Sequence, residues 1–508
     1  MDSDNRQIVG GATISYILIA INALYGFIVT PYIVFQIGDA SFGVYKTITS
    51  FAASLMVIDL GIGGTVQRYI ANYRASDKSR LIGNFVYMFL MEAAILAVIA
   101  TSIVLGIYFN LNNIFRNGLS QDEIELAKQL FLVLGITIVF HLFENVLNGI
   151  ITGYGKFIVS NGLRLFRILL RLIGTFALLF VWKSPLTLVI IDCALVILLL
   201  IFEIFYSIHR LKLKMSFTHF DSTIFKESLI YSLMMFVTAL ANQMNGNLDN
   251  IVIGAFMTSK DVAVYSMAII IFGMFEQIAC SISSVLLPKM SFVIEEGGVA
   301  SAKKYVISVG RVQFILLGAI YGAFIVVGKD FISIWIGETY IPAYFIAIII
   351  MGPAILELCV NVCLTMLRVV NKLKFKTIVT VSMMVLNAVL TIIGVKYWGY
   401  YMAAIATALS YLIGSVLIMN IYYHKEFGYN MFTVYSSIFS RTFLCIILSS
   451  IMSWFAIYSF DNHIYRFVLG SIVFIIVYGI SLLLWGLNTQ ERTLVSTKNL
   501  DGYIKFNN

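Results

Sequence analysis

The sequence predicts an all-α integral membrane protein with about 14 transmembrane helices, arranged as two six-helix pseudo-symmetric lobes plus two C-terminal helices. Of its 508 residues, 60% are hydrophobic and only 12% are charged. The mean hydropathy is +0.93. A soluble chain cannot bury this much apolar surface, because accessible surface grows too fast relative to volume. The composition therefore excludes a soluble enzyme, a nucleic-acid-binding domain and a secreted module.

The helices themselves are predicted from runs of apolar residues. A bilayer core of about 30 Å takes roughly 20 apolar residues per helix. Fourteen segments meet this length: 10–35, 43–67, 82–109, 128–152, 157–181, 185–208, 228–257, 262–287, 305–328, 341–367, 375–396, 400–423, 439–459 and 464–487. The first is too long for a signal-peptide core and no small-residue cleavage site follows it, so we expect it to remain a helix.

Basic residues predict how these helices are oriented. Twenty-three Lys and Arg residues lie toward one side of the membrane in the predicted arrangement of spans, and eight lie toward the other side. The positive-inside rule places the richer side in the cytoplasm. Both termini are then cytoplasmic, as an even number of spans requires. The net charge of +8 is thereby explained by topology, and we expect no nucleic-acid partner.

An internal repeat predicts the two lobes. Gly43-Val44-Tyr45-Lys46 opens the second span, and Ala263-Val264-Tyr265-Ser266 opens the eighth at an offset of 220 residues. Asn145-Val146 matches Asn361-Val362 at an offset of 216. The predicted parts are 1–215 (spans 1–6), 216–430 (spans 7–12), 431–487 (spans 13–14) and a short cytoplasmic tail, 488–508. Parallel repeats suit alternating access. The alternative explanation of these matches is that any two apolar helices have similar sequences and that no repeat exists.

Three stretches carry a family resemblance. VIDLGIGGTVQRYIA (57–71), NLDNIVIGAFMTSKDVAVYSMA (247–268) and the region 361–414 resemble polysaccharide exporters of the multidrug/oligosaccharidyl-lipid/polysaccharide superfamily, which include the O-antigen, capsule and exopolysaccharide repeat-unit flippases. The resemblance implies a flippase in the bacterial plasma (inner) membrane. Its cargo would be an undecaprenyl-diphosphate-linked oligosaccharide, moved from the cytoplasmic to the outer leaflet.

The resemblance also sets expectations for partners. A polyprenyl-diphosphate-linked glycan and membrane lipids are the expected ligands, with a polysaccharide polymerase and glycosyltransferases as pathway partners of a functional monomer. We expect no cofactor and no metal. The sequence has no GxxxxGK[ST] loop and no zinc-ligand spacing, so we expect no built-in ATPase.

Arginines at membrane depth predict the substrate-binding site. Arg164, Arg167 and Arg171 lie in the span 157–181, within about a 60° arc of one helix face. A charge at a helix centre costs about 2.5–3.5 kcal/mol on insertion scales, so these side chains should face a cavity or a partner. They form either a cationic stripe for an anionic headgroup or a set of buried pairs with carboxylates. The guanidinium fork matches phosphate oxygens.

Carboxylates at membrane depth are the candidates for ion coupling and for balancing the arginines. His141 and Glu144 lie three residues apart on one face of their span, either as a proton relay or as an interhelical hydrogen bond. Asp192 and Glu276 are the further ion-coupling candidates. The remaining deep carboxylates are Asp59, Glu92, Glu203, Asp249 and Glu357.

A polar face on the seventh predicted span completes the candidate site. Gln243, Asn247 and Asn250 share this face. Their neutral donors and acceptors suit sugar hydroxyls, or they hold neighbouring helices together.

Two other functions compete with the flippase. A cation-coupled drug antiporter of the same superfamily needs an acidic, aromatic cavity, which the arginines disfavour. A membrane-embedded polymerase or glycosyltransferase needs charged external loops to hold donor phosphates, and the outer loops here are short with few charges. The expectation is therefore a transporter and not an enzyme.

Overall fold

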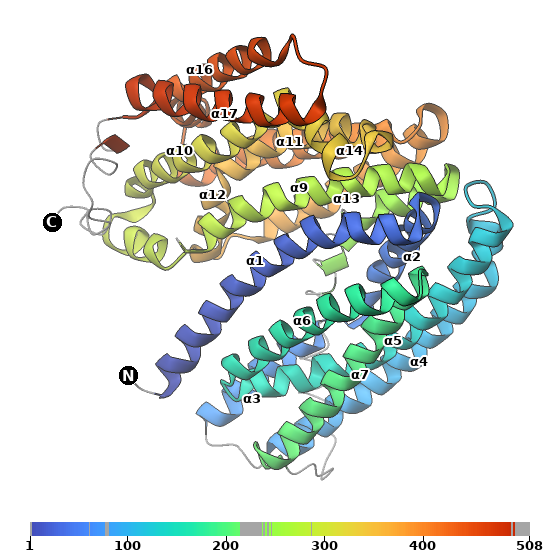
Figure 1. Ribbon diagram of the computed structural model, residues 1–508. Coiled ribbons are helices and arrows are strands. Elements are labelled where there is room, and N and C mark those ends of the chain that lie inside the picture. Colours follow the sequence, from blue (N-terminus) through green and yellow to red (C-terminus); the bar gives the residue numbers. More distant parts are fainter. Residues whose placement is uncertain are drawn as a thin grey trace. The chain divides into compact units, whose positions relative to one another are not determined.

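The computed structural model describes residues 3–59, 61–76, 81–213, 236, 239–240, 243–244, 246–285, 287–488 and 491–492. The regular structure of these residues is helical, without strands (Figure 1). The predicted all-α class is confirmed. Eleven helices in this part of the chain are long and apolar enough to cross a membrane, so the protein is a multi-pass membrane protein.

The first half of the chain contains α1 (Ser3–Ile37), α2 (Asp39–Leu55), the 3₁₀ turn η1 (Met56–Asp59), α3 (Ile62–Ala75), α4 (Ile82–Ile114), α5 (Gln121–Gly153), α6 (Phe157–Val181) and α7 (Pro185–His209). The second half contains α9 (Ser259–Val285), α10 (Leu287–Trp335), η3 (Glu338–Tyr340), α11 (Pro342–Cys359), α12 (Asn361–Val369), α13 (Lys374–Trp398), α14 (Tyr401–Ser410), the π-helix η4 (Tyr411–Ile418), α15 (Met419–Phe427), α16 (Met431–Ile457), α17 (His463–Ser481) and the π-turn η5 (Leu482–Gly486).

The eleven candidate spans coincide with eleven of the fourteen predicted segments. The other three have separate reasons. The segment 10–35 lies in α1, whose apolar part is Leu24–Ile37. The segment 157–181 is α6, which carries three arginines. Much of the segment 228–257 lies outside the described residues.

Local sequence explains where several helices begin. Ser120 and Glu123 form a capping box at the start of α5. Ser184 caps α7, with Pro185 in its first turn, and Asn462 caps α17 through the backbone N–H groups of Ile464 and Tyr465. Such side chains satisfy N–H groups that a helix leaves without partners at its first turn.

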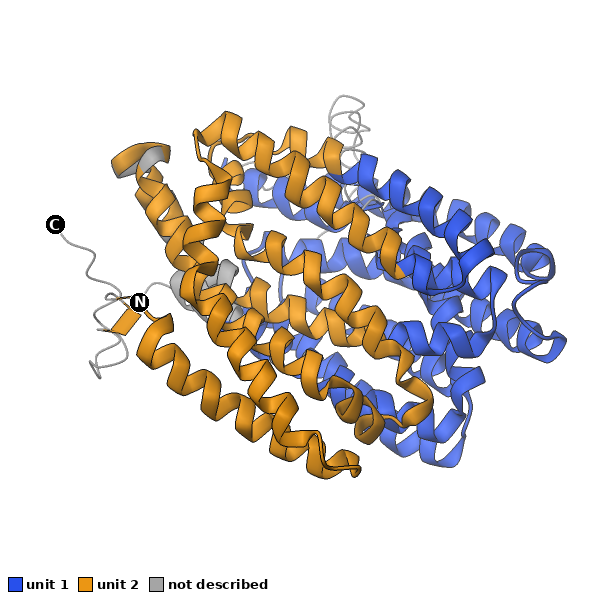
Figure 2. Ribbon diagram, turned by 90° about the horizontal axis from the view of Figure 1, so that it is seen from above, with its two compact units in different colours: residues 1–266, 380–403 blue, residues 267–379, 404–508 orange. Residues whose placement is uncertain are grey.

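The described helices divide into two compact units (Figure 2). Unit 1 comprises Met1–Ser266 with Thr380–Ala403, and unit 2 comprises Met267–Val379 with Ala404–Asn508. Unit 1 thus takes most of α13 from late in the chain. The predicted lobes, 1–215 and 216–430, are defined by the repeat and stay a prediction.

In unit 1, the stretch around Gly61 interrupts the second predicted span. Gly61 has φ +68°, a left-handed conformation that glycine adopts without strain, and it separates η1 from α3. The backbone N–H of Gly61 donates to Asp59 Oδ1 at 2.9 Å. A Cβ on Gly63 would lie 2.9 Å from the carbonyl oxygen of Asn145 on α5. The Gly-rich motif therefore lets α3 approach α5 closely and fixes Asp59 beside it.

In unit 2, α16 and α17 pack against α10, and an ion pair fastens one end of this packing. Arg311 on α10 is 6% exposed. Its Nε and Nη2 atoms lie 2.7 and 3.0 Å from the two carboxylate oxygens of Glu491. It also donates to the backbone carbonyls of Ser437 on α16 and Gly486 in η5. One guanidinium thus joins α10 to both C-terminal helices and to the start of the tail.

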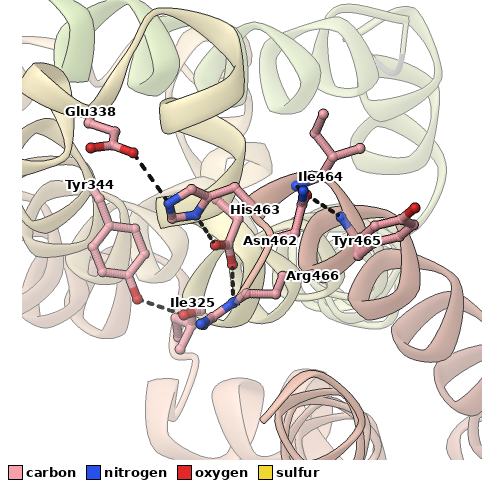
Figure 3. Close-up of polar contacts among 9 residues, drawn as sticks. Ile325, Glu338, Tyr344, Asn462, His463, Ile464, Tyr465 and Arg466 are labelled. Carbon is pink, nitrogen blue, oxygen red and sulfur yellow. Dashed lines mark hydrogen bonds and ion pairs between the residues drawn. The ribbon is translucent and has the colours of Figure 1, made fainter. Parts of the chain in front are cut away.

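A second cluster lies where the C-terminal end of α10 meets the start of α17 (Figure 3). Asp330 is 2% exposed. Its two oxygens lie 2.6 Å from His463 Nδ1 and 3.2 Å from Arg466 Nε. The other ring nitrogen of His463 lies 3.6 Å from Glu338. Together with the Arg311 pair, this cluster holds the C-terminal helices on α10 at both ends.

Candidate anion-binding and ion-coupling site

Helix α6 carries the three arginines, and within unit 1 it packs on α1 and α7. Polar contacts set its register along α1. Asn161 Nδ2 donates to Ser15 Oγ at 3.0 Å, and Tyr32 Oη donates to the carbonyl oxygen of Phe176 at 3.0 Å. The register places the three guanidiniums in three different environments.

Arg171 is held rigidly. Its Nε and Nη2 atoms lie 2.7 and 2.8 Å from the two oxygens of Asp192 on α7. Its guanidinium carbon also lies 5.2 Å from the ring centroid of Tyr25 on α1, within the range of a cation–π interaction. Such a bidentate pair is among the strongest polar contacts in proteins. Arg171 is thus paired with a carboxylate, which is one of the two arrangements expected for these arginines.

Arg167 is paired more loosely. Its Nη1 atom lies 3.7 Å from Glu144 Oε1. The other Glu144 oxygen is 2.7 Å from His141 Nδ1, so the two ion-coupling candidates on α5 are in direct contact. At 3.7 Å the arginine makes an ion pair without a well-formed hydrogen bond. Its guanidinium can therefore exchange this partner for another anion at little cost.

The contact of His141 extends to η1. Asn145 Nδ2 lies 3.4 Å from His141 Nε2 and donates to Asp59 Oδ2 at 2.8 Å. If His141 Nδ1 donates to Glu144, its Nε2 atom is free to accept from Asn145. Arg167, Glu144, His141, Asn145 and Asp59 then form one continuous polar chain through unit 1.

Arg164 differs from the other two arginines. It is exposed on α6, and among the described residues it has no ion-pair partner. The three arginines thus face two paired carboxylates, Glu144 and Asp192. Arg164 is the arginine of the three that makes no ion pair among the described residues.

A buried carboxyl lies beside this chain. Asn148, one turn beyond Glu144 on α5, donates from Nδ2 to Glu203 Oε1 on α7 at 3.0 Å. Ser160 at the start of α6 donates to Asn148 Oδ1 at 3.1 Å. The sequence predicts Glu203 and Asp59 only as deep carboxylates, and Asn148 and Asn145 are not among the residues predicted for this site. The available signal was the spacing of the α5 residues His141, Glu144, Asn145 and Asn148, which places them on one helix face.

The predicted sugar-binding residues lie elsewhere in unit 1, in contacts between helices. Gln243 Nε2 donates to the carbonyl oxygen of Ala53 on α2 at 3.1 Å. Asn250 donates to Ser50 Oγ at 3.0 Å and accepts from Ser266 Oγ at 3.2 Å. Asn247 Nδ2 donates to the carbonyl oxygen of Gln243 at 3.1 Å. Their role in sugar binding stays a prediction.

Glu276, the remaining ion-coupling candidate, belongs to unit 2. It lies on α9 within electrostatic range of Glu357 on α11. Glu357 in turn lies 3.3 Å from Lys376 Nζ. Each unit therefore has its own group of charged residues at membrane depth.

Comparison with known proteins identifies the family. Residues 8–293 match the family model described as "Polysaccharide biosynthesis protein", which is more than half of the 508-residue chain. The chain belongs to this family. No curated protein matches its sequence.

The fold of this polysaccharide biosynthesis family member is similar to solved structures of transporters. One is the lipid II flippase MurJ in an inward closed conformation, with a TM-score of 0.70 at 18% identity over 96% of this chain and 99% of that one. Another is an inward-facing multidrug resistance MATE transporter, with a TM-score of 0.58 at 16% identity, covering 82% of this chain and 94% of that one. A third is a MOP superfamily transporter from Pyrococcus furiosus, with a TM-score of 0.54 at 15% identity over 85% and 96% of the two chains. The chain thus shares the fold of these solved flippases and transporters.

Proposed function

We propose that this polysaccharide biosynthesis family member is a flippase that moves an undecaprenyl-diphosphate-linked oligosaccharide repeat unit from the cytoplasmic to the outer leaflet. The observation that carries the proposal is the group of three arginines on α6, of which two are paired with carboxylates and Arg164 makes no ion pair among the described residues. Charge buried in a membrane is expensive and marks a functional site. An unpaired positive charge calls for an anionic ligand.

The geometry of the arginines supports a division of labour in binding the diphosphate. Arg164 is exposed and Arg167 is loosely paired, so both can turn their guanidinium forks toward phosphate oxygens. Arg171 is locked to Asp192 and contributes its field from a fixed position. An organic cation would be repelled by this arrangement, which argues against the antiporter alternative.

The charge of the cargo supplies an energy source. A diphosphate carries about two negative charges, and outward movement from a negative cytoplasm runs down the electrical gradient. At about 2.3 kcal/mol per charge per 100 mV, two charges release about 4–5 kcal/mol per 100 mV. The protein then needs only a path that lowers the desolvation barrier of the headgroup, which the arginines supply. A proton on Glu144, Asp192 or Glu276 would assist the return of the empty carrier.

This proposal predicts that export depends on membrane potential. Collapsing the potential with a potassium ionophore at constant ΔpH should slow export of the lipid-linked cargo in vesicles, because the electrical driving force is lost. The matched control clamps ΔpH to zero at constant potential and should leave most of the rate. If only the loss of ΔpH slows export, the membrane potential does not drive transport, and proton antiport through the carboxyl groups explains it instead.

An apolar pocket in unit 2 fits the tail of such a cargo. It has a volume of about 450 Å³ and is lined by Arg441, Leu444, Cys445 and Leu448 of α16 and Trp485 of η5. A polyprenyl tail is too long and apolar to cross the membrane through a wet cavity. All five lining residues belong to the predicted spans 13–14, which would form a lateral groove for the tail.

Filling this pocket should slow transport of long-chain cargo. Leu448→Trp removes space for at least two methylene groups of the tail, each worth about 0.8 kcal/mol, which corresponds to about a tenfold loss or more. Transport rates of a long-chain and a short-chain lipid-linked cargo measure the effect, and the short-chain rate should stay unchanged. Ile475→Trp on the exposed surface of α17 is the matched control. Equal rates for Leu448→Trp and Ile475→Trp with long-chain cargo would show that the pocket does not hold the polyprenyl tail.

A further inference from the structure

Among the described residues, one carboxyl oxygen of Glu203 on α7 has no partner. Its side chain is 1% exposed, and Oε1 accepts from Asn148 Nδ2 at 3.0 Å. Within the described part of the chain, the buried Oε2 atom has no hydrogen-bond partner. One helical turn further along α7, the buried hydroxyl of Ser207 likewise has none in that part. Two polar oxygens on one face of α7 thus have no partner in the described part of the chain.

The surrounding hydrogen bonds identify which oxygen of Glu203 carries a proton. Ser160 Oγ donates to Asn148 Oδ1, which turns the amide NH₂ group of Asn148 toward Glu203 Oε1. Oε1 is therefore an acceptor, like the carbonyl oxygen of a neutral acid. An ionised carboxylate would leave Oε2 negative, dry and unpaired, which is strongly unfavourable. A proton on Oε2 replaces the buried charge by a neutral hydroxyl, which costs far less to bury.

Glu203 also lies in the field of the arginine site. Helix α7 packs against α5, α6 and α2. Among the described residues, the charged groups that act on Glu203 are Glu144 on α5, which has the same sign, and Arg164 and Arg167 on α6, which have the opposite sign. At a rise of 1.5 Å per residue, Arg164 lies about 10 Å from the start of α6 and Glu203 about 9 Å from the end of α7. Both helix ends are cytoplasmic in the predicted topology, so the two groups share one depth.

We propose that Glu203 is a proton-binding site, neutral in this conformation, and that its proton and an anionic diphosphate on Arg164 and Arg167 favour each other's binding. Without a diphosphate, the positive charge of Arg164 and Arg167 stabilises the ionised form of Glu203. When a diphosphate is bound to these arginines, their charge is neutralised, and Glu203 therefore keeps its proton. By linkage, the proton must then strengthen binding of the anion by the same factor. This inference rests on the proposed function, since it takes these arginines as the diphosphate site.

Glu92 on α4 provides a matched control. Its side chain is 5% exposed, and both its oxygens are buried without a partner among the described residues. In the described part of the chain no charged group acts on Glu92, and its environment differs from water by burial alone. Glu92 should therefore also be neutral, but its proton should be independent of the arginines.

Binding of inorganic pyrophosphate to the purified full-length protein tests the linkage. From mildly acidic to mildly alkaline pH, we expect the affinity of the wild type to fall by about fivefold or more as Glu203 loses its proton. Glu203→Gln, which mimics the neutral acid, should keep its affinity, and Glu92→Gln should behave as the wild type. The ionisation of pyrophosphate is common to all three proteins. An identical pH dependence in wild type and Glu203→Gln overturns the proposal, as does a dependence on sodium in place of pH.

Infrared spectroscopy separates failure of the proton site from failure of the proposed function. If none of the proteins binds pyrophosphate, the diphosphate site is wrong and the proton is tested alone. The carbonyl stretching band of protonated carboxyl groups should then be present in the wild type at neutral pH and reduced in Glu203→Gln. A band that Glu203→Gln leaves unchanged means that Glu203 is ionised, and the inference fails.

Discussion

Replacing Arg164 and Arg167 together by glutamine should abolish transport while the protein still inserts and folds. Each charge-assisted hydrogen bond to a phosphate contributes about 1.5–3 kcal/mol. Loss of two such contacts therefore slows transport about 100-fold or more. Neither arginine is in a tight pair, since Arg164 is exposed and Arg167 lies 3.7 Å from Glu144, so the fold should tolerate both changes. Initial transport rates at equal amounts of membrane-inserted protein measure the effect.

Two further variants sharpen this prediction. Arg116→Gln removes an exposed positive charge from unit 1 outside α6 and should keep the wild-type rate. Lysine in place of both Arg164 and Arg167 keeps the charge but loses the planar fork that pairs with phosphate, and should restore part of the rate. Wild-type transport by the double glutamine variant would show that the arginines do not bind the cargo.

Removing the Arg311 guanidinium should destabilise unit 2 more than any other single change at its charged groups. Arg311→Met removes the guanidinium donor from the carbonyl oxygens of Ser437 and Gly486 and leaves the Glu491 carboxylate with the backbone N–H of Asn488. Breaking a buried ion pair on one side costs about 3–5 kcal/mol. The free energy of unfolding, measured by denaturant titration in detergent micelles, should fall by this amount.

The paired replacement is the control for the Arg311 prediction. Replacing a whole buried ion pair by apolar residues is often neutral, so Arg311→Met with Glu491→Leu should recover most of the lost stability. Equal stability of the wild type and Arg311→Met would mean that the pair does not hold the C-terminal helices on α10.

The fold class and most helix bounds follow from the sequence because burial in lipid requires long apolar runs. The segment 157–181 coincides with α6. The segment 43–67 was expected as one span, yet η1 and Gly61 divide it into α2 and α3. Hydropathy is insensitive to this break because both sides are apolar. The signal was the run Gly61-Ile62-Gly63-Gly64, which permits the turn and the close contact with α5.

The candidate site was predictable in its charged residues and not in their partners. The spacing of the arginines places them on one face of α6, but helix periodicity carries no information on which neighbouring helix meets that face. Asp192 and Glu144 became partners through the packing of α6 beside α7 and α5. Asn145 and Asn148 escaped selection because an uncharged amide in a span is a weak signal. Only the structure joins them to Asp59 and Glu203.

Reconstitution into liposomes tests whether the protein itself moves the lipid-linked oligosaccharide between the leaflets. Purified protein is placed in liposomes with a fluorescent undecaprenyl-diphosphate-linked oligosaccharide, and an impermeant quencher reports which leaflet holds the label. We expect protein-dependent transfer of the label to the opposite leaflet, faster when the membrane potential favours movement of the anion. We also expect loss of this transfer in the Arg164→Gln, Arg167→Gln double variant. Transfer no faster than in protein-free liposomes, together with export of an organic cation by the same preparation, would contradict the proposed function.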